Sequence, residues 1–173
     1  MSPILIARFD APWCGAVWIT SAVAVTALAV PSLVSLCGSV PLPHLVRLIL
    51  TWAPIGGIAV AGAFAVRGYG LTAHEIRILR PGWTTALPLS GLESITADPQ
   101  AMRGSIRTFG NGGLFSISGW YRNERLGRYR AFGTDPSRAV VLRYAQHTVV
   151  VTPREPGRFV AAVRGLVPPP KTQ

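Results

Sequence analysis

The chain has 173 residues, a formal net charge of +10, and hydrophobic residues at 49 % of its positions. Its two cysteines lie at positions 14 and 37, so the later part of the chain can hold neither a zinc knuckle nor a thiol nucleophile. Its three histidines and seven carboxylates show no spacing typical of a metal site or a catalytic triad. We therefore expect a protein that is not an enzyme and that has no metal and no cofactor.

Two long apolar runs open the chain. Apart from Arg47, residues 11–66 contain no Asp, Glu, Lys or Arg. A helix needs about 20 consecutive, mostly apolar residues to cross a bilayer core, and each run supplies that length. The pattern predicts a transmembrane helical hairpin over residues 1–67. The first predicted span is at about 13–37 and the second at about 45–66. A Pro-broken link at 38–43 joins them.

Cleavage of the first run as a signal peptide is the alternative to a retained helix. The tripeptide Ala27-Leu28-Ala29 fits the small-x-small pattern that precedes a cleavage site, and Arg8 gives a weakly positive start. Against cleavage, Asp10 offsets that charge, and the apolar run continues past the tripeptide to Cys37. Whether the first segment is retained or cleaved stays open at this point.

Basic residues flank the hairpin unequally. Arg8 precedes the first span, and Arg67, Arg77 and Arg80 follow the second, whereas the region between the spans offers Arg47 alone. Lys and Arg close to the ends of spans favour the cytoplasmic side of the membrane. We expect both termini, and with them the domain that follows the hairpin, to be cytoplasmic.

The second apolar run is rich in small residues. Gly56 and Gly57 are followed by Ala59, Ala61 and Gly62. Small side chains let two membrane helices approach closely. They fit either packing of the hairpin against itself or formation of a homo-oligomer, and the sequence leaves both open.

Beyond residue 67 the apolar pattern shortens to the length of strands. Turn residues such as Pro81-Gly82 and the run 110–113 (GNGG) separate short β-prone segments. This spacing indicates an antiparallel sandwich or a small barrel. The predicted strands are at 74–80, 83–89, 94–97, 104–109, 114–121, 128–133, 139–144 and 148–151.

A helix is predicted to follow the last strand. Thr152, Pro153 and Glu155 match a capping box, with Thr as the N-cap, Pro at the first helical position and Glu at the third. Apolar residues then recur at helical spacing, and we expect the helix to cover the open end of the barrel. These apolar residues are Phe159, Val160, Val163 and Leu166. The Pro-rich stretch 168–173 cannot continue the helix and forms a tail.

Several motifs together resemble one protein family. The segments are 109–115 (FGNGGLF), 119–121 (GWY), 127–132 (GRYRAF) and 150–153 (VVTP). From about Tyr69 to Leu166 the chain resembles the bacterial pleckstrin-homology-like (PH-like) domains, in which a membrane hairpin commonly precedes the domain. The resemblance implies a partly open barrel of seven strands with a capping helix, used for binding rather than catalysis.

The expected protein is therefore an α+β membrane protein of the bacterial cell membrane. Two transmembrane helices are followed by a mainly antiparallel PH-like β barrel over residues 68–167, capped by a C-terminal helix. The barrel is expected on the cytoplasmic side, and the tail at 168–173 completes the chain.

Arginine dominates the charge of the expected domain. Residues 67–173 carry fifteen basic and six acidic groups, and Lys171 is the one lysine of the chain. Arg offers planar, bidentate donors that suit carboxylate and phosphate. Along the strand 128–133, Arg128 and Arg130 should share one face. The candidate ligand-binding or lipid-binding residues are Arg103, Arg107, Arg122, Arg125, Arg128 and Arg130.

Two kinds of function fit these residues. In the first, the domain is an interaction module that binds a protein or peptide partner, or a second copy of itself, by pairing at an exposed edge strand. In the alternative, the arginines recognise anionic lipid of the inner leaflet, which attracts basic groups near the membrane. Solvated positive charge needs no ligand at all. No nucleic-acid-binding motif is present, so we expect no nucleic-acid partner.

Overall fold

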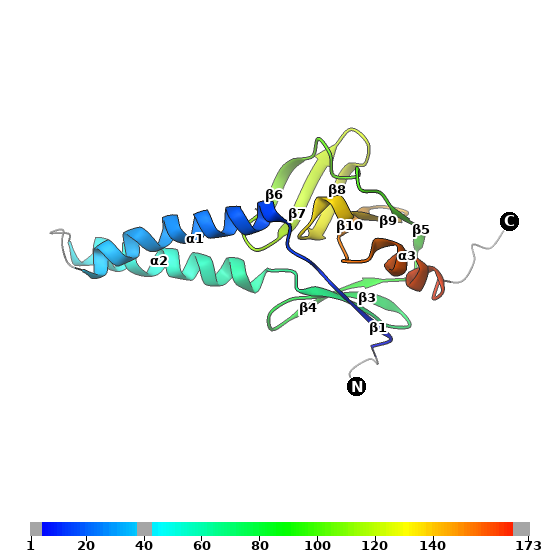
Figure 1. Cartoon of the computed structure of the whole chain (residues 1–173), viewed down its shortest axis with the longest axis horizontal. Helices are drawn as coiled ribbons and strands as arrows, with labels where there is room; N and C mark the ends of the chain where they lie inside the picture. The colour runs from blue at the N-terminus through cyan, green and yellow to red at the C-terminus, as the bar shows by residue number, and fades with distance from the viewer. Residues whose placement is uncertain (1–4, 38–42, 168–173) are drawn as a thin grey trace.

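A computed structural model describes residues 5–37 and 43–167 of the chain. Two long helices extend side by side from one end of a β domain, which is built from two sheets and a short C-terminal helix (Figure 1). The expected Pro-broken link, apart from Pro43, and the expected tail at 168–173 lie outside the described residues.

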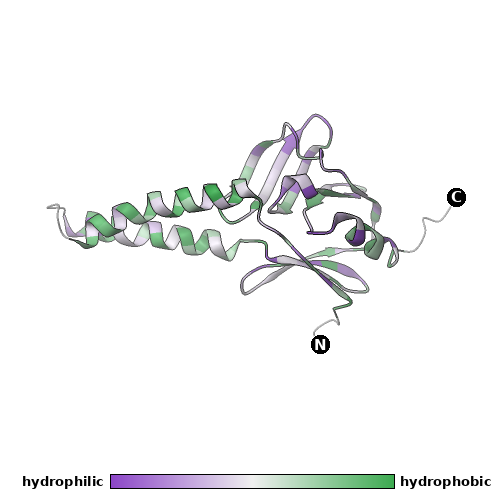
Figure 2. Ribbon diagram, viewed as in Figure 1, coloured by the Kyte–Doolittle hydropathy of each residue, from purple (hydrophilic) through white to green (hydrophobic). Residues whose placement is uncertain are grey.

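The two long helices are α1 (Gly15–Leu36) and α2 (His44–Ala63). Both are long and apolar enough to cross a membrane, as expected. Of their most apolar windows, 17 % and 6 % of the residues are buried, so neither helix is the core of a soluble domain. Hydrophobic residues recur along both helices, whereas hydrophilic residues gather on the β domain (Figure 2).

Polar side chains join the two helices. The Ser32 hydroxyl donates to the Thr51 carbonyl at 3.1 Å, and the Thr51 hydroxyl donates to Ser35 Oγ at 3.1 Å. Gly56 and Gly57 are not at this contact, because no other element of the described chain comes within 4 Å of where a Cβ on either glycine would be. The hairpin therefore leaves part of the small-residue face of α2 uncovered.

The first sheet contains four antiparallel strands in the order β1-β2-β3-β4. They are β1 (Ala7–Asp10), β2 (Gly68–Leu71), β3 (Glu75–Leu79) and β4 (Thr84–Pro88). Sequence analysis missed β1, which precedes the helical hairpin and pairs with β2 across it, Ala7 opposite Leu71 and Asp10 opposite Gly68. Because β1 and β2 share one sheet, both ends of the hairpin lie on the same side of any membrane that it crosses.

The second sheet contains six strands in the order β5-β9-β10-β8-β7-β6. All neighbours are antiparallel except β10 and β8, which are parallel. The strands are β5 (Leu92–Ala97), β6 (Ile106–Gly112), β7 (Ile117–Asn123), β8 (Gly127–Gly133), β9 (Val140–Tyr144) and β10 (Thr148–Val151). The predicted strands all have counterparts, displaced at their ends by a few residues.

The expectation of a barrel is wrong for the described residues, in which the two sheets stay separate. A run of consecutive hairpins can curl until its first and last strands pair. Here β10 returns between β8 and β9 instead, so β5 and β6 become the two edges of their sheet. The domain is a pair of mostly antiparallel sheets packed face to face.

The main core lies between the two sheets and under the helix α3 (Pro156–Arg164). The Phe9 and Phe159 rings meet edge to face with centroids 5.1 Å apart, so β1 and α3 close one end of this core. Tyr69 lies fully buried at its centre, where its hydroxyl donates to the Phe132 carbonyl at 2.7 Å and accepts from the Thr152 amide at 3.0 Å. Burial raises the pKa of Tyr69 to about 12.

The predicted capping box is wrong. The helix α3 begins at Pro156 with Glu155 as N-cap, and no side chain caps it. Thr152 has a different partner, because its hydroxyl accepts hydrogen bonds from the Thr134 amide at 2.8 Å and the Asp135 amide at 3.3 Å. The threonine therefore joins the ends of β8 and β10, and the helix starts at the second proline, where a missing N–H costs nothing.

The glycine-rich segment that was expected to form a turn lies partly in a strand. Gly110 and Gly112 belong to β6, and the turn to β7 comes later, at residues 113–116. Gly110 lies opposite Gly119 in the ladder, and both have positive φ, +108° and +146°. A Cβ on Gly119 would overlap the Phe109 carbonyl of the neighbouring strand, so this crossing requires glycine.

The turn of the β6–β7 hairpin docks on α1. The hydroxyls of Thr20 and Ser21 donate to the Gly113 carbonyl at 3.0 and 3.2 Å, and the Phe115 amide donates to Ser21 Oγ at 2.8 Å. Ser116 Oγ also donates to the Phe64 carbonyl at the end of α2, at 3.3 Å. The irregular turn is thus hydrogen-bonded to both helices.

Candidate functional site

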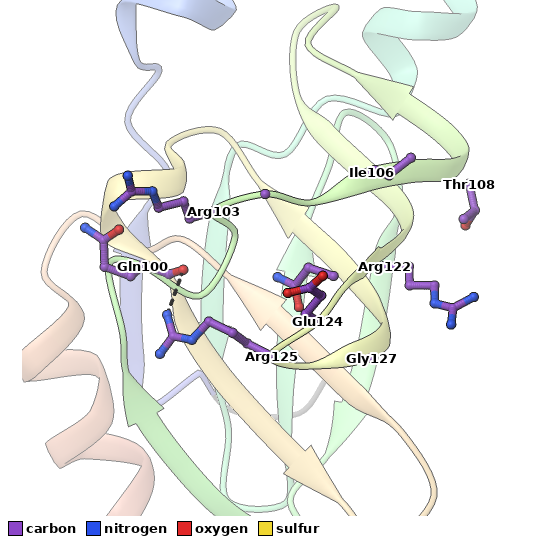
Figure 3. Close-up of a pocket in the computed structure, with 10 residues that line it drawn as sticks. Gln100, Arg103, Ile106, Thr108, Arg122, Glu124, Arg125 and Gly127 are labelled. Carbon is purple, nitrogen blue, oxygen red and sulfur yellow. Dashed lines mark hydrogen bonds between the residues drawn. The ribbon is translucent and has the colours of Figure 1, made fainter.

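An open cleft lies at the end of the β6–β7 hairpin opposite its turn (Figure 3). Its volume is about 1040 Å³. Its walls come from the loop between β5 and β6, from β6 itself, and from the connection between β7 and β8. We call it the arginine cleft, and its lining residues are Gln100, Arg103, Gly104, Ile106, Thr108, Arg122, Asn123, Glu124, Arg125 and Gly127.

Local hydrogen bonds explain why the loop between β5 and β6 lies over the sheet. Asn123 Nδ2 donates to the Ala101 carbonyl at 2.7 Å and to Ser105 Oγ at 2.9 Å, and Ser105 Oγ also lies 2.7 Å from the Tyr129 hydroxyl. Ala101 and Tyr129 belong to a second apolar cluster on the outer face of the six-stranded sheet. Buried contacts therefore hold the loop in place beneath the charged rim of the cleft.

Arg125 has a structural partner. Its guanidinium donates to the Asp98 carboxylate at 3.0 Å and to the Gln100 carbonyl at 3.0 Å, the second of which is the dashed line in Figure 3. These bonds tie the loop to the connection between β7 and β8. Arg103 and Arg122 take part in none of the ion pairs of the described chain. They are the charges of the cleft that remain for a ligand, with Glu124 as the one carboxylate in its wall.

Arg128 and Arg130 lie on the same strand face, as expected, but their partners are aromatic rings. The Arg128 guanidinium carbon lies 4.6 Å from the Trp120 ring centroid, and that of Arg130 lies 4.6 Å from the Phe132 ring and 5.9 Å from Trp120. Such cation–π contacts stabilise exposed guanidiniums by about 0.5–1 kcal/mol each. Arg130 thereby lies in a groove that it shares with residues of α2.

Arg107 lies on the opposite face of the sheet. It pairs in register with Tyr121, and its charge partly opposes the effect of burial, which raises the pKa of that tyrosine. The six candidate arginines therefore do not form one surface. Arg103, Arg122 and Arg125 line the arginine cleft, Arg128 and Arg130 stack on Trp120, and Arg107 points away from both groups.

The strand β6 leaves one edge of the six-stranded sheet unpaired in the described chain. Its side chains are exposed, including Ile106 at 73 % and Phe109 at 76 %. A bulge shifts the register between Arg107 and Phe109, so that Ile106 opposite Arg122 and Phe109 opposite Trp120 share one face. Two apolar side chains therefore flank an open backbone edge beside the arginine cleft.

Sequence analysis missed Arg80 as a site residue and counted it only as a charge that flanks the second span. Its side chain is 8 % exposed and lies against three aromatic rings at the base of α2. Its position before Pro81-Gly82 gave no signal of burial, because the rings come from Phe64 just after α2, Trp83 just before β4, and Phe132 in β8. In the described residues no group of three His, Cys, Asp or Glu could hold a metal ion.

Residues 67–167 match the family model described as Bacterial PH domain. No curated protein and no solved structure matches the chain. The family match begins one residue before β2 and ends after α3, so it covers both sheets apart from β1 and excludes the helical hairpin. Because it spans more than half of the 173 residues, the chain belongs to the bacterial PH-domain family.

Proposed function

We propose that this protein is a membrane-anchored, non-catalytic interaction module that binds an extended, acidic segment of a partner protein at β6, on the cytoplasmic side of the membrane. PH-like domains are in general binding modules, which supports the class of function. The observation that carries the proposal is the unpaired edge of β6 with Ile106 and Phe109 exposed on one face.

An extended segment can add to such an edge by backbone hydrogen bonds, while its alternate side chains find pockets on the sheet. Beside β6, Ile106 offers an apolar contact, and the guanidiniums of Arg103 and Arg122 lie in the adjoining cleft. Because Arg103 and Arg122 outnumber the one carboxylate of the cleft, Glu124, the cleft favours a segment with acidic side chains. Complementary charge also speeds the encounter with the right partner.

The membrane anchor and the cytoplasmic side rest on the hairpin and its flanking charges. The helices α1 and α2 expose apolar side chains over most of their surface, which water does not tolerate over such an area. The β sheet formed by residues from both ends of the hairpin places Arg8, Arg67 and Arg77 at the same end of it. The positive-inside rule then favours the cytoplasm for that end.

The test is site-specific photo-crosslinking of the full-length protein in bacterial cells. A photoreactive amino acid at position 106 should give an adduct of one defined mass, and the same probe at Thr96 on the opposite edge strand should not. The double charge reversal Arg103→Glu and Arg122→Glu should abolish the adduct at 106. The matched control Arg143→Glu changes an exposed arginine on β9 and should leave it intact. Equal adducts from both edges, or an adduct insensitive to the cleft charges, would reject this function.

A further inference from the structure

A groove runs between the C-terminal half of α2 and the β6–β7 hairpin. Its volume is about 400 Å³. One end is apolar and is lined by Gly57, Val60 and Ala61 of α2, and the other end holds Arg80 and Arg130. We call it the junction groove. It lies on the other side of Trp120 from the arginine cleft and shares none of the residues of that cleft.

Arg80 is the unusual residue of the junction groove. Its guanidinium carbon lies 4.3 Å from the Trp83 ring, 5.2 Å from Phe132 and 5.7 Å from Phe64. Its Nε is buried with no hydrogen-bond partner in the described chain, and the side chain takes part in none of the ion pairs there. A buried donor without an acceptor carries a desolvation cost, so the described protein alone leaves this Nε unsatisfied.

A second cation makes the need for an anion stronger. Burial lowers the pKa of Arg80, and the charge of Arg130 lowers it further. The groove is lined by no carboxylate of the described residues. An anion between the two guanidiniums would supply the missing hydrogen-bond acceptor and would remove the repulsion between them.

The position of the groove indicates where that anion comes from. Trp83 Nε1 donates to the Ala63 carbonyl at 2.9 Å, at the last residue of α2, and tryptophan at the end of a span is typical of the membrane interface. The groove then continues along the helix past Ala61 and Val60 to Gly57, where the space beyond the backbone is open. It is therefore charged at the level of headgroups and apolar at the level of acyl chains.

We propose that the junction groove binds one anionic phospholipid, with its phosphate between Arg80 and Arg130 and an acyl chain along Gly57, Val60 and Ala61. Gly57 makes room for that chain, because no other element of the described chain lies within 4 Å of where its Cβ would be. The proposal rests on the membrane anchoring inferred above but not on the protein partner. The groove shares Phe109 of β6 with the partner-binding edge, whereas Ile106 and the arginine cleft lie outside the groove.

The experiment counts lipids on the full-length protein. The protein is reconstituted in nanodiscs of phosphatidylglycerol and phosphatidylcholine, released into mild detergent, and examined by native mass spectrometry. One phosphatidylglycerol should stay bound. The double variant Arg80→Gln and Arg130→Gln should lower that occupancy by about tenfold or more, as expected for lost charge-assisted hydrogen bonds. The matched control Arg128→Gln and Arg143→Gln removes two exposed arginines and should retain the lipid.

A second variant protects the test against misfolding of the first. Gly57→Leu keeps both arginines and fills only the apolar end of the groove, so it should also displace the lipid. Full phosphatidylglycerol occupancy in Gly57→Leu or in the Arg80/Arg130 variant would overturn the proposal. A further arm of the experiment adds glycerol phosphate in solution. If glycerol phosphate displaces the lipid when its concentration equals that of the lipid, the site binds free phosphate instead. Failure of the crosslink at position 106 affects none of these outcomes.

Discussion

The two ends of the β6–β7 hairpin carry the same type of side chain in opposite surroundings. At the open end, Arg103 and Arg122 are exposed in the arginine cleft, and water and salt screen their charge. At the turn end, Arg80 is buried among aromatic rings at the end of α2. A unit charge interacts about four times more strongly near a protein surface than in bulk water, and burial increases the difference. Burial and partners, rather than the number of arginines, decide which cation needs a ligand.

This difference distinguishes the two modes of binding that we propose for the domain. The exposed cleft suits a partner that arrives from solution and whose binding weakens with salt. The junction groove suits a molecule that is already present in the membrane and is released rarely. Because β6 and β7 connect the two sites, both sites require an intact β6–β7 hairpin.

The largest effect is expected from Gly119→Ala. Gly119 has a φ of +146°, and a Cβ there would overlap the Phe109 carbonyl of β6. Backbone strain alone costs about 1–3 kcal/mol, and the overlap adds to it, so unfolding should become easier by about 3 kcal/mol. The measurement is denaturant unfolding of the full-length protein in detergent. Gly127→Ala, with a φ of +66° but open space around its Cβ, is the control and should cost less. Equal costs would show that the close strand approach is unimportant.

Unfolding at alkaline pH tests whether burial also disfavours a charged side chain in the main core, where Tyr69 lies. The pKa of Tyr69 is about 12 in the folded protein against 10.0 for the ordinary side chain. The folded state keeps its proton while the unfolded state loses it. Stability is therefore complete below about pH 10 and falls by up to about 3 kcal/mol as the pH rises to 12. Tyrosinate absorbance during unfolding measures this. Tyr69→Phe should remove part of the pH dependence, whereas a curve identical to that of the wild type would contradict the assignment.

Docking of the turn end on α1 is tested by Ser21→Ala. This change removes a donor to the Gly113 carbonyl and leaves the Phe115 amide without its acceptor. A buried backbone group without a partner costs about 1–3 kcal/mol, and the Phe115 amide is partly buried, so we expect a loss of about 1–2 kcal/mol. Hydrogen exchange should rise at residues 113–116 and stay unchanged at the arginine cleft. Ser90→Ala, at an exposed position between β4 and β5, serves as the matched substitution. Increased exchange at both ends would mean that the ends are not independent.

The smallest effect is expected at the open end, from Arg125→Ala. Its ion pair with Asp98 is largely exposed, and such pairs contribute at most about 1 kcal/mol. The loss should shrink further as salt is added. Thermal unfolding across a salt series measures it, with the Asp98→Asn variant as the second corner of a double-mutant cycle. A loss as large as that of Ser21→Ala would erase the contrast between the two ends.

Local pattern in the sequence was sufficient for the elements themselves. Uncharged runs of span length predicted α1 and α2, turn residues separated the strands from β3 to β10, and helical spacing of Phe159 and Val163 predicted α3. The motifs around residues 109–132 also led to the family that the match over residues 67–167 confirms. These features depend on periodicity, composition and turn chemistry over short stretches of chain, so they can be read without a partner.

The tertiary structure decided everything that depends on which distant segments meet. It paired β1 with β2 across the helical hairpin, and it placed β10 between β8 and β9, so that no barrel closes in the described chain. Thr152 accepts a hydrogen bond from the Thr134 amide instead of capping a helix. The tertiary structure also divided six arginines among three places and buried Arg80, which no local pattern distinguishes from its neighbours. Pairing register and burial arise from contacts between residues far apart in sequence, and the free energy of a charge depends on those contacts.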